Sequence, residues 1–197
     1  MKTHTARTLH DRLHDHRGQL DGVQRVLELA AGHGRDTLYF AGQGFTVVAT
    51  DFSDVAVAQL RRSAQARGVS ARVQPIVHDL RQPLPVKTGS IDGAFAHMAL
   101  CMALSTSEIH AVVAEVGRVL RPGGKFIYTV RHTGDAHYGA GQAHGDDIFE
   151  CAGFAVHFFR RELVARLATG WVLEEVHDFE EGELPRRLWR VTVTKPA

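Results

Sequence analysis

The sequence predicts an α/β fold in which an open, mostly parallel sheet carries helices on both faces. From residue 25 to residue 131, short apolar strands alternate with amphipathic helices, a pattern typical of parallel strands joined by helical crossovers. Near the end of the chain, only residues 180–187 separate the apolar segments 171–179 and 188–195. Because this connection is too short for a crossover helix, we expect these two strands to be antiparallel neighbours.

The individual elements follow from apolar runs that are bounded by turn residues. The expected strands are 25–29, 46–50, 72–78, 91–97, 125–131, 171–179 and 188–195. The expected helices are 35–42, 53–67, 105–120 and 160–168. Ser105 and Glu108 form a capping-box pattern, and Pro75 indicates that its strand lies at an edge of the sheet. The glycine-rich segment 132–152 shows no period, and we expect a long loop there.

Composition narrows the classes of protein to consider. The 197 residues are 44% hydrophobic and 23% charged, which suits one globular domain over 25–197, preceded by a helical or lid-like segment over 1–24. A formal charge of +1 argues against nucleic-acid binding, and no apolar run is long enough for a membrane span. The polar start at Met1 and the two cysteines predict a cytoplasmic protein. We expect a monomer or a homodimer, although no motif specifies the oligomeric state.

The most informative motif is the segment LELAAGHGRD over residues 27–36, where a buried strand enters a glycine turn and a helix follows. Glycines allow a ligand to approach the backbone closely, and the helix N-terminus offers free N–H groups. A dinucleotide-binding loop would carry a third glycine. Here Glu28 lies beside the loop, where it would repel a pyrophosphate and suit an amine. The motif therefore favours an aminoacyl-type nucleoside over NAD.

Two further acids follow the next strands of the predicted sheet. Asp51 comes directly after the strand 46–50, where a carboxylate can accept hydrogen bonds from both ribose hydroxyls. Phe52 can lie against an adenine ring, and Asp79 can accept a hydrogen bond from an exocyclic amine. An acid at a strand end is often only a turn residue. Together, in this order, the residues indicate a nucleoside site.

These residues, with the strand IDGAFAH and the turn LRPGG over 120–124, resemble the class I S-adenosylmethionine-dependent methyltransferases. The resemblance covers about residues 20–195. It implies a Rossmann-like seven-stranded sheet of order 3-2-1-4-5-7-6 with strand 7 antiparallel, S-adenosylmethionine as cofactor and S-adenosylhomocysteine as product. The residues implied to bind the cofactor are Glu28, Ala30, Gly32, Gly34, Asp51, Phe52, Asp79, Leu80 and His97. Ala30 replaces a glycine of the family, which leaves slightly less room beside the methionine part.

The acceptor is expected to be a small molecule. A minimal fold offers no added RNA-binding module, and a cationic rim that includes Arg131 suits an anionic or soft nucleophile. The tail, from Phe158 to Arg186, is similar to small tellurite-resistance and thiopurine methyltransferases. In that group a histidine and an arginine belong to the acceptor site, and here Pro185 replaces the histidine while Arg186 matches. A thiol, a chalcogen compound or another anionic nucleophile is the expected acceptor, with His97, Arg131 and Arg186 as candidate catalytic residues.

Other interpretations of the same residues stay open. An NAD(P)-dependent oxidoreductase or a non-catalytic nucleoside-binding protein can share this fold. Histidines gather at two places, at His10 and His14 and at His132, His137 and His144. Because no HExxH or CxxC pattern accompanies them, we expect no metal site. His97 lies where the resemblance puts the methyl group, and it is the candidate for a general base.

Overall fold

The computed structural model describes residues 25–182 and 186–197, so the predicted N-terminal segment lies outside the described residues. The strands are β1 (Arg25–Leu29), β2 (Thr46–Asp51), β3 (Val73–Val77), β4 (Ile91–His97), β5 (Leu120–Arg131), β6 (Gln142–Ala143), β7 (Ile148–Cys151), β8 (Phe154–His157), β9 (Val172–Glu181) and β10 (Arg186–Thr194). The helices are α2 (Arg35–Gly42), α3 (Asp54–Ala66), the 3-10 helix η1 (Ser70–Arg72), α4 (Thr106–Val119) and α5 (Arg161–Leu167).

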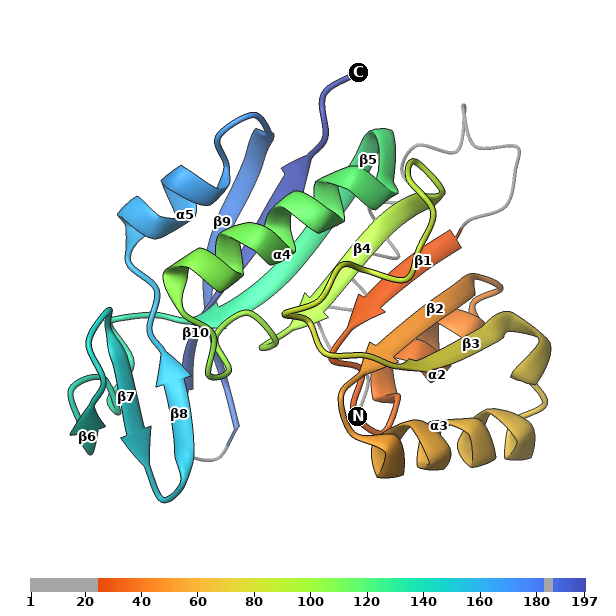
Figure 1. The fold of residues 1–197 in the computed structure, drawn as a ribbon, viewed down its shortest axis with the longest axis horizontal. Helices are drawn as coiled ribbons and strands as arrows, with labels where there is room; N and C mark the ends of the chain where they lie inside the picture. Colours follow the sequence, from red (N-terminus) through yellow and green to blue (C-terminus); the bar gives the residue numbers. More distant parts are fainter. Residues whose placement is uncertain (1–24, 183–185) are drawn as a thin grey trace.

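Seven of these strands form the main sheet, in the order β3-β2-β1-β4-β5-β10-β9 (Figure 1). The pairs from β3 to β5 are parallel, whereas β10 runs antiparallel to both of its neighbours. This is the predicted order, with β9 and β10 as the sixth and seventh strands of the sheet. The expected C-terminal hairpin is therefore confirmed, and Pro75 lies on the edge strand β3 as predicted.

Helices cover both faces of the sheet because side chains alternate along each strand. Leu27 and Leu29 of β1 belong to a large apolar core under α4 and α5. Val26 points the other way, into a smaller core with Leu38 of α2 and Leu60 of α3. Figure 1 shows α4 and α5 crossing the near face of the sheet. No helix of the described segments is both long and apolar enough to cross a lipid bilayer.

The start of α4 is fixed by the capping box that its sequence predicts. The hydroxyl of Ser105 accepts the backbone N–H of Glu108, and the Glu108 carboxylate accepts the backbone N–H of Ser105 at 2.8 Å. These hydrogen bonds hold the pKa of Glu108 below its usual value. A cap of this kind contributes about 1 kcal/mol to the stability of a helix. It also fixes the position of the chain between β4 and α4, which borders the site described below.

The expectation of a long loop over 132–152 is wrong for its second half. The strands β6, β7 and β8 form a separate three-stranded antiparallel sheet, which projects from one side of the main sheet (Figure 1). The β7–β8 hairpin turns at Ala152 and Gly153, and both residues adopt positive φ, as a tight two-residue hairpin requires. These strands are two to four residues long. Such short segments show too few alternating apolar and polar residues for the sequence to predict them among irregularly spaced glycines.

Two glycines provide a matched test of the packing around α2. Gly34 has φ +81°, and a Cβ added there would lie 2.2 Å from Cδ1 of the buried Leu60. Gly44 has φ +99°, but a Cβ there would meet no atom within 4 Å. We expect Gly44→Ala to lower the free energy of unfolding by about 1 kcal/mol through backbone strain. Gly34→Ala should cost about 1–3 kcal/mol more, because Leu60 must shift within a packed core.

Urea unfolding of the two variants, followed by circular dichroism, measures this difference. Equal destabilisation by the two substitutions would contradict the close packing of Leu60 against the loop.

Candidate active site

The carboxyl ends of β1, β2 and β4 meet at one edge of the sheet, and three cavities follow one another along it. The first cavity, of about 270 Å³, lies beside β1 and the start of α2. The second, of about 660 Å³, shares Ala30 and His97 with the first. The third, of about 420 Å³, shares Met98, Met102 and Phe154 with the second. Because neighbouring cavities share lining residues, the three adjoin one another along the edge where ligands of open α/β sheets bind.

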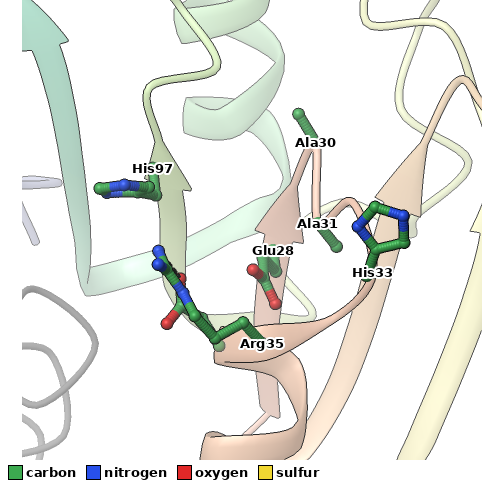
Figure 2. A pocket seen from close by; sticks show the side chains of 7 residues that line it. Glu28, Ala30, Ala31, His33, Arg35 and His97 are labelled. Atoms are coloured by element: carbon green, nitrogen blue, oxygen red, sulfur yellow. Dashed lines mark hydrogen bonds and ion pairs between the residues drawn. The ribbon is translucent and has the colours of Figure 1, made fainter. Parts of the chain in front are cut away.

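A buried carboxylate forms the wall of the first cavity. Glu28 is 3% exposed, and its carboxylate accepts a hydrogen bond from the hydroxyl of Thr37. Burial, with the nearby negative charge of Asp36, raises the pKa of Glu28 to about 8. Figure 2 shows this carboxylate, Arg35 and His97 gathered around the same space. The carboxyl group lacks a full counter-charge, so a cationic group that enters the cavity would favour its ionised form.

Arg35 is a site residue that the sequence analysis missed. Its guanidinium lines the first cavity, is half-exposed, and lies 3.4 Å from the Asp36 carboxylate. The first cavity therefore offers a carboxyl group and a guanidinium cation to one ligand. The position of Arg35 at the first turn of α2, directly after Gly34, was the signal that could have identified it.

The loop after β1 is shaped by backbone conformation and tied to β2. Ala30 has φ +50°, so an alanine holds a conformation that favours glycine. The N–H of Ala31 donates to the carbonyl of Thr50 at 2.9 Å, and the N–H of Gly32 donates to Oδ2 of Asp51 at 2.7 Å. Ala30 lines both of the first two cavities. Gly32 and Gly34 line none of the three, and their positive φ angles shape the turn of the loop.

The second cavity brings together the residues that the sequence assigns to a nucleoside, namely Asp51, Phe52, Asp79 and Leu80. Asp51 is 7% exposed, and its other oxygen accepts the N–H of Ser53 at 2.9 Å. Each of its oxygens therefore keeps a lone pair for a further donor. Phe52 is 79% exposed, so its ring is free to cover a flat ligand.

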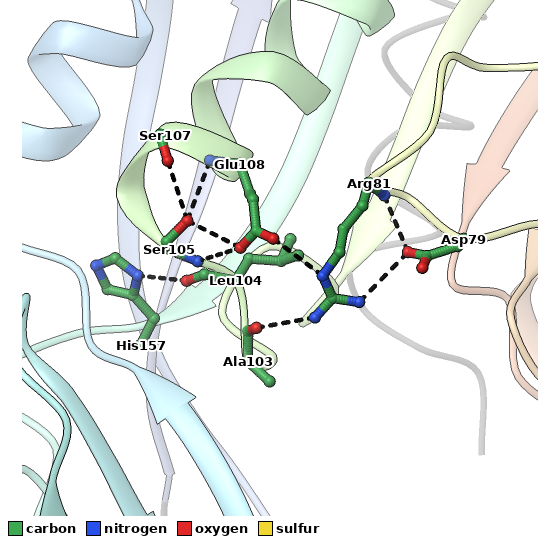
Figure 3. Close-up of polar contacts among 8 residues, drawn as sticks. All are labelled: Asp79, Arg81, Ala103, Leu104, Ser105, Ser107, Glu108 and His157. Atoms are coloured by element: carbon green, nitrogen blue, oxygen red, sulfur yellow. Dashed lines mark hydrogen bonds and ion pairs between the residues drawn. The ribbon is translucent and has the colours of Figure 1, made fainter.

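Arg81 connects the second cavity to the cap of α4. Its guanidinium lies 3.4 Å from Oδ1 of Asp79 and 3.0 Å from Oε1 of Glu108, and it donates to the carbonyl of Ala103 at 3.2 Å (Figure 3). These contacts orient the loop after β3 against the loop after β4. Asp79 also accepts the N–H of Arg81 at 3.0 Å, which leaves its second oxygen available to a ligand.

His97 lies at the end of β4, where the first two cavities meet. Its Nδ1 lies 3.0 Å from the hydroxyl of Thr129, and its Nε2 lies 3.2 Å from Oε2 of Glu181. The hydroxyl of Thr129 also accepts the N–H of Met98, at 2.9 Å. The contact with His97 holds the pKa of Glu181 below its usual value. Both ring nitrogens of His97 are therefore engaged, and Glu181 and Thr129 are partners that the sequence analysis did not foresee.

Arg131 and Arg186 both line the third cavity, but their charges are placed differently. Arg131 binds the buried Asp135 carboxylate through two hydrogen bonds, of 3.1 and 2.6 Å, and lies 5.0 Å from the centroid of the Phe158 ring. Burial opposes ionisation of Asp135, but Arg131 and the N–H groups of His137 and Arg187 lower its pKa to about 2. Arg186 is exposed, with Nη1 3.9 Å from Sδ of Met98.

The histidines singled out in the sequence do not converge. His132 stacks on Trp189 with ring centroids 4.4 Å apart, whereas His144 lies 2.8 Å from Glu150. Within residues 25–182 and 186–197, no group of three or more His, Cys, Asp or Glu side chains is arranged to hold a metal ion. His10 and His14 lie outside the described residues. Both cysteines are free, and the exposed one, Cys151, lines the third cavity.

Comparisons with known proteins identify the family. A family model described as a methyltransferase domain matches residues 26–124, half of the chain, and the chain belongs to this family. An uncharacterized methyltransferase of Synechocystis sp. is 30% identical over 109 residues, which are 55% of this chain and 48% of that protein. The chain thus spans about half the length of this relative.

Solved structures share the fold. A SAM-dependent methyltransferase from Methanosarcina mazei superposes with a TM-score of 0.77 at 18% identity, over 91% of this chain and 96% of that one. A 1,6-didemethyltoxoflavin-N1-methyltransferase of Burkholderia thailandensis was solved with bound 1,6-didemethyltoxoflavin and S-adenosylhomocysteine. It superposes with a TM-score of 0.74 at 22% identity, over 98% of this chain and 79% of that one. At these identities the likeness concerns the fold alone. The family match thus confirms the predicted class, the methyltransferases, and the solved structures confirm the fold.

The raised pKa of Glu28 predicts a characteristic dependence of stability on pH. Its folded-state pKa of about 8 exceeds the ordinary 4.5, so the folded state holds this proton more tightly than the unfolded state. This contribution is fully present below pH 4.5 and is lost as the pH rises through 8, at roughly 1 kcal/mol per pH unit. We expect the stability of the wild-type protein to fall relative to Glu28→Gln over this range.

Denaturant unfolding at several pH values measures the two slopes. Glu162→Gln, at the exposed start of α5, is the matched control and should follow the wild type. Parallel curves for the wild type and Glu28→Gln would contradict a buried Glu28 with a raised pKa.

Proposed function

We propose that this protein transfers a methyl group from S-adenosylmethionine to a small-molecule acceptor. The observation that carries the proposal is the row of three adjoining cavities, with Glu28 at one end, Asp51 in the middle and an apolar cavity at the other end. The first cavity suits an amino-acid group, the second a nucleoside, and the third an acceptor. This order matches the parts of S-adenosylmethionine followed by the molecule that it methylates.

In this proposal, residues that line the first two cavities bind the separate parts of S-adenosylmethionine. The Glu28 carboxylate pairs with the ammonium group, and the Arg35 guanidinium pairs with the carboxylate of the same amino-acid part. Asp51 accepts the ribose hydroxyls through the lone pairs that Gly32 and Ser53 leave free. Phe52 and Leu80 enclose the adenine ring.

The adenine edge has its own partner in Asp79. Its second oxygen accepts a hydrogen bond from the exocyclic amine, while Arg81 holds the first. Such a contact would distinguish an adenine from a base that presents an acceptor at this position.

When bound, S-adenosylmethionine supplies an activated methyl group on a sulfonium, and S-adenosylhomocysteine is left when the sulfur keeps the bonding electron pair. The protein aligns the acceptor with that bond and excludes water from it. Positioning of this kind can supply about 7–11 kcal/mol of the barrier. His97 and Met98 lie where the cavities meet, so their side chains border the reacting atoms.

The surroundings of His97 favour a positioning role over that of a general base. The Thr129 hydroxyl accepts the N–H of Met98 and lies 3.0 Å from Nδ1 of His97. Nε2 of His97 lies 3.2 Å from the Glu181 carboxylate. Both ring nitrogens thus already face a polar group of the protein, which favours holding the ring in place over accepting a substrate proton. We therefore infer that the acceptor reaches the site with its nucleophilic atom already deprotonated or without a proton to lose.

The rival functions fit these features less well. A nicotinamide dinucleotide would place a pyrophosphate near the buried Glu28, and that negative charge would disfavour the ionised form of the carboxyl group still further. A protein that only bound a nucleoside would need no third cavity beyond His97 and Met98. The proposal includes cytoplasmic action on a small anionic or soft nucleophile, with Arg131 and Arg186 at its cavity. The absence of a nucleic-acid partner and a monomeric or homodimeric state remain predictions.

Calorimetric titration tests the cofactor. We expect S-adenosylhomocysteine to bind, and NAD⁺ and NADPH not to bind. Asp51→Asn should weaken S-adenosylhomocysteine by about 10- to 100-fold, because hydrogen bonds to a charged acceptor are lost. Asp54→Asn, at the exposed start of α3, is the matched control and should bind as the wild type does. Binding of a nicotinamide nucleotide in place of S-adenosylhomocysteine would contradict the proposed function.

A further inference from the structure

The third cavity differs in character from the site that a small inorganic acceptor would need. Resting on the proposed function, we propose that the acceptor is a planar aromatic molecule that carries an ionised oxygen or sulfur, as in an acidic phenol or an aromatic thiol. Its ring would occupy the third cavity, and its anionic atom would face Arg186 and the junction at Met98. This narrows the expected thiols, chalcogen compounds and other anions to one class.

Aromatic side chains build the wall of this cavity. Phe149 and Phe158 line it, and both rings pack edge to face against Tyr138, with centroids 5.3 and 5.6 Å from it. Because this cluster is interlocked, the wall is a fixed apolar surface. Edge-to-face and offset contacts with such rings favour a further aromatic ring. The flexible thioethers of Met98 and Met102 lie between this wall and the second cavity and can adapt to its outline.

A hard oxyanion such as tellurite or selenite would gain little from these surroundings. It would exchange its hydration for phenylalanine rings and thioethers, which cannot replace the lost hydrogen bonds. An aromatic anion avoids this cost, because its ring contacts the wall while one charged atom stays at the exposed mouth. The third cavity thus favours an acceptor with separate apolar and charged parts.

The charges around the cavity indicate where the anionic atom lies. The charge of Arg131 is compensated by Asp135, which also pairs with His137 at 3.2 Å. Arg186, in contrast, has no carboxylate of the described residues within ion-pair distance. Glu181 is close enough to sense the charge of Arg186, but its carboxylate is directed to His97. Among the described residues, Arg186 is therefore the guanidinium of this cavity that has no paired carboxylate and can face a ligand.

The position of Arg186 also connects to the chemistry. Its Nη1 lies 3.9 Å from Sδ of Met98, the residue that borders both the second and the third cavity. An anion beside Arg186 is thus held next to the point where the methyl group would be presented. The lone pair of the phenolate or thiolate forms the new bond to the methyl carbon, and the electron pair of the broken bond stays on the sulfonium sulfur. No proton has to be removed, which agrees with the engaged nitrogens of His97.

The test uses the full chain saturated with S-adenosylhomocysteine, and it measures binding of 4-nitrophenol by calorimetry above and below the pKa of that phenol. We expect the phenolate to bind about tenfold more tightly than the neutral phenol, and 4-nitroanisole, which cannot ionise, to show no dependence on pH. Arg186→Gln should lower the affinity for the phenolate about tenfold. Arg187→Gln is the matched control, because this neighbouring arginine does not line the cavity and pairs with Glu180.

Phe149→Ala tests the wall in the same assay. It should weaken both 4-nitrophenol and 4-nitroanisole while leaving the affinity for S-adenosylhomocysteine unchanged, and this second readout also reports correct folding. Turnover with S-adenosylmethionine, followed as S-adenosylhomocysteine release, then compares thiophenol with tellurite and 2-mercaptoethanol. We expect thiophenol to be methylated at least tenfold faster than the other two.

The outcomes separate the two proposals. Binding of S-adenosylhomocysteine without binding of 4-nitrophenol, or preferred methylation of tellurite or 2-mercaptoethanol, would overturn the aromatic acceptor and leave the methyl transfer intact. Equal effects of Arg186→Gln and Arg187→Gln would overturn the assigned place of the anion. Failure to bind S-adenosylhomocysteine at all would overturn the proposed function and this inference with it.

Discussion

The Asp51 carboxylate holds together the two loops on which the site depends. It accepts one N–H from Gly32, in the loop after β1, and one from Ser53, in the loop after β2. Because β1 and β2 are parallel neighbours, both loops leave the sheet at the same edge, and one buried side chain can reach both. The hydrogen bond from Gly32 thus ties to β2 the loop in which Ala30 adopts a positive φ.

The three cavities differ in charge and polarity in a way that suits one elongated ligand and its reaction partner. Glu28 places a buried acid at one end, and Arg186 places an exposed cation near the other. Between them, His97 lies within 3.0 Å of the Thr129 hydroxyl and 3.2 Å of the Glu181 carboxylate. In the proposed function the site therefore controls position and charge, and the acceptor arrives with its nucleophile already ionised.

The strands and helices of the main sheet and the residues at its strand ends could be predicted, because the 2.0- and 3.6-residue periods and the glycine turn are local signals. The order of the strands came from the family resemblance. Glu28, Asp51 and Asp79 come directly from those signals and the family resemblance. The small sheet β6–β8 could not be predicted, because its strands are too short to show a period. Arg35 and Glu181 were missed for a different reason: a charged residue in a turn or at a strand end is ordinary until the fold shows which cavity it faces.

The most direct test of the account is a crystal structure of the full chain grown with S-adenosylhomocysteine. We predict that its amino group contacts the Glu28 carboxylate, its ribose hydroxyls contact Asp51, and its adenine lies against Phe52, with the sulfur beside His97. A ligand that lies outside the first two cavities, or one bound with its amino-acid part away from Glu28, would contradict the assignment of this edge of the sheet as the site of methyl transfer.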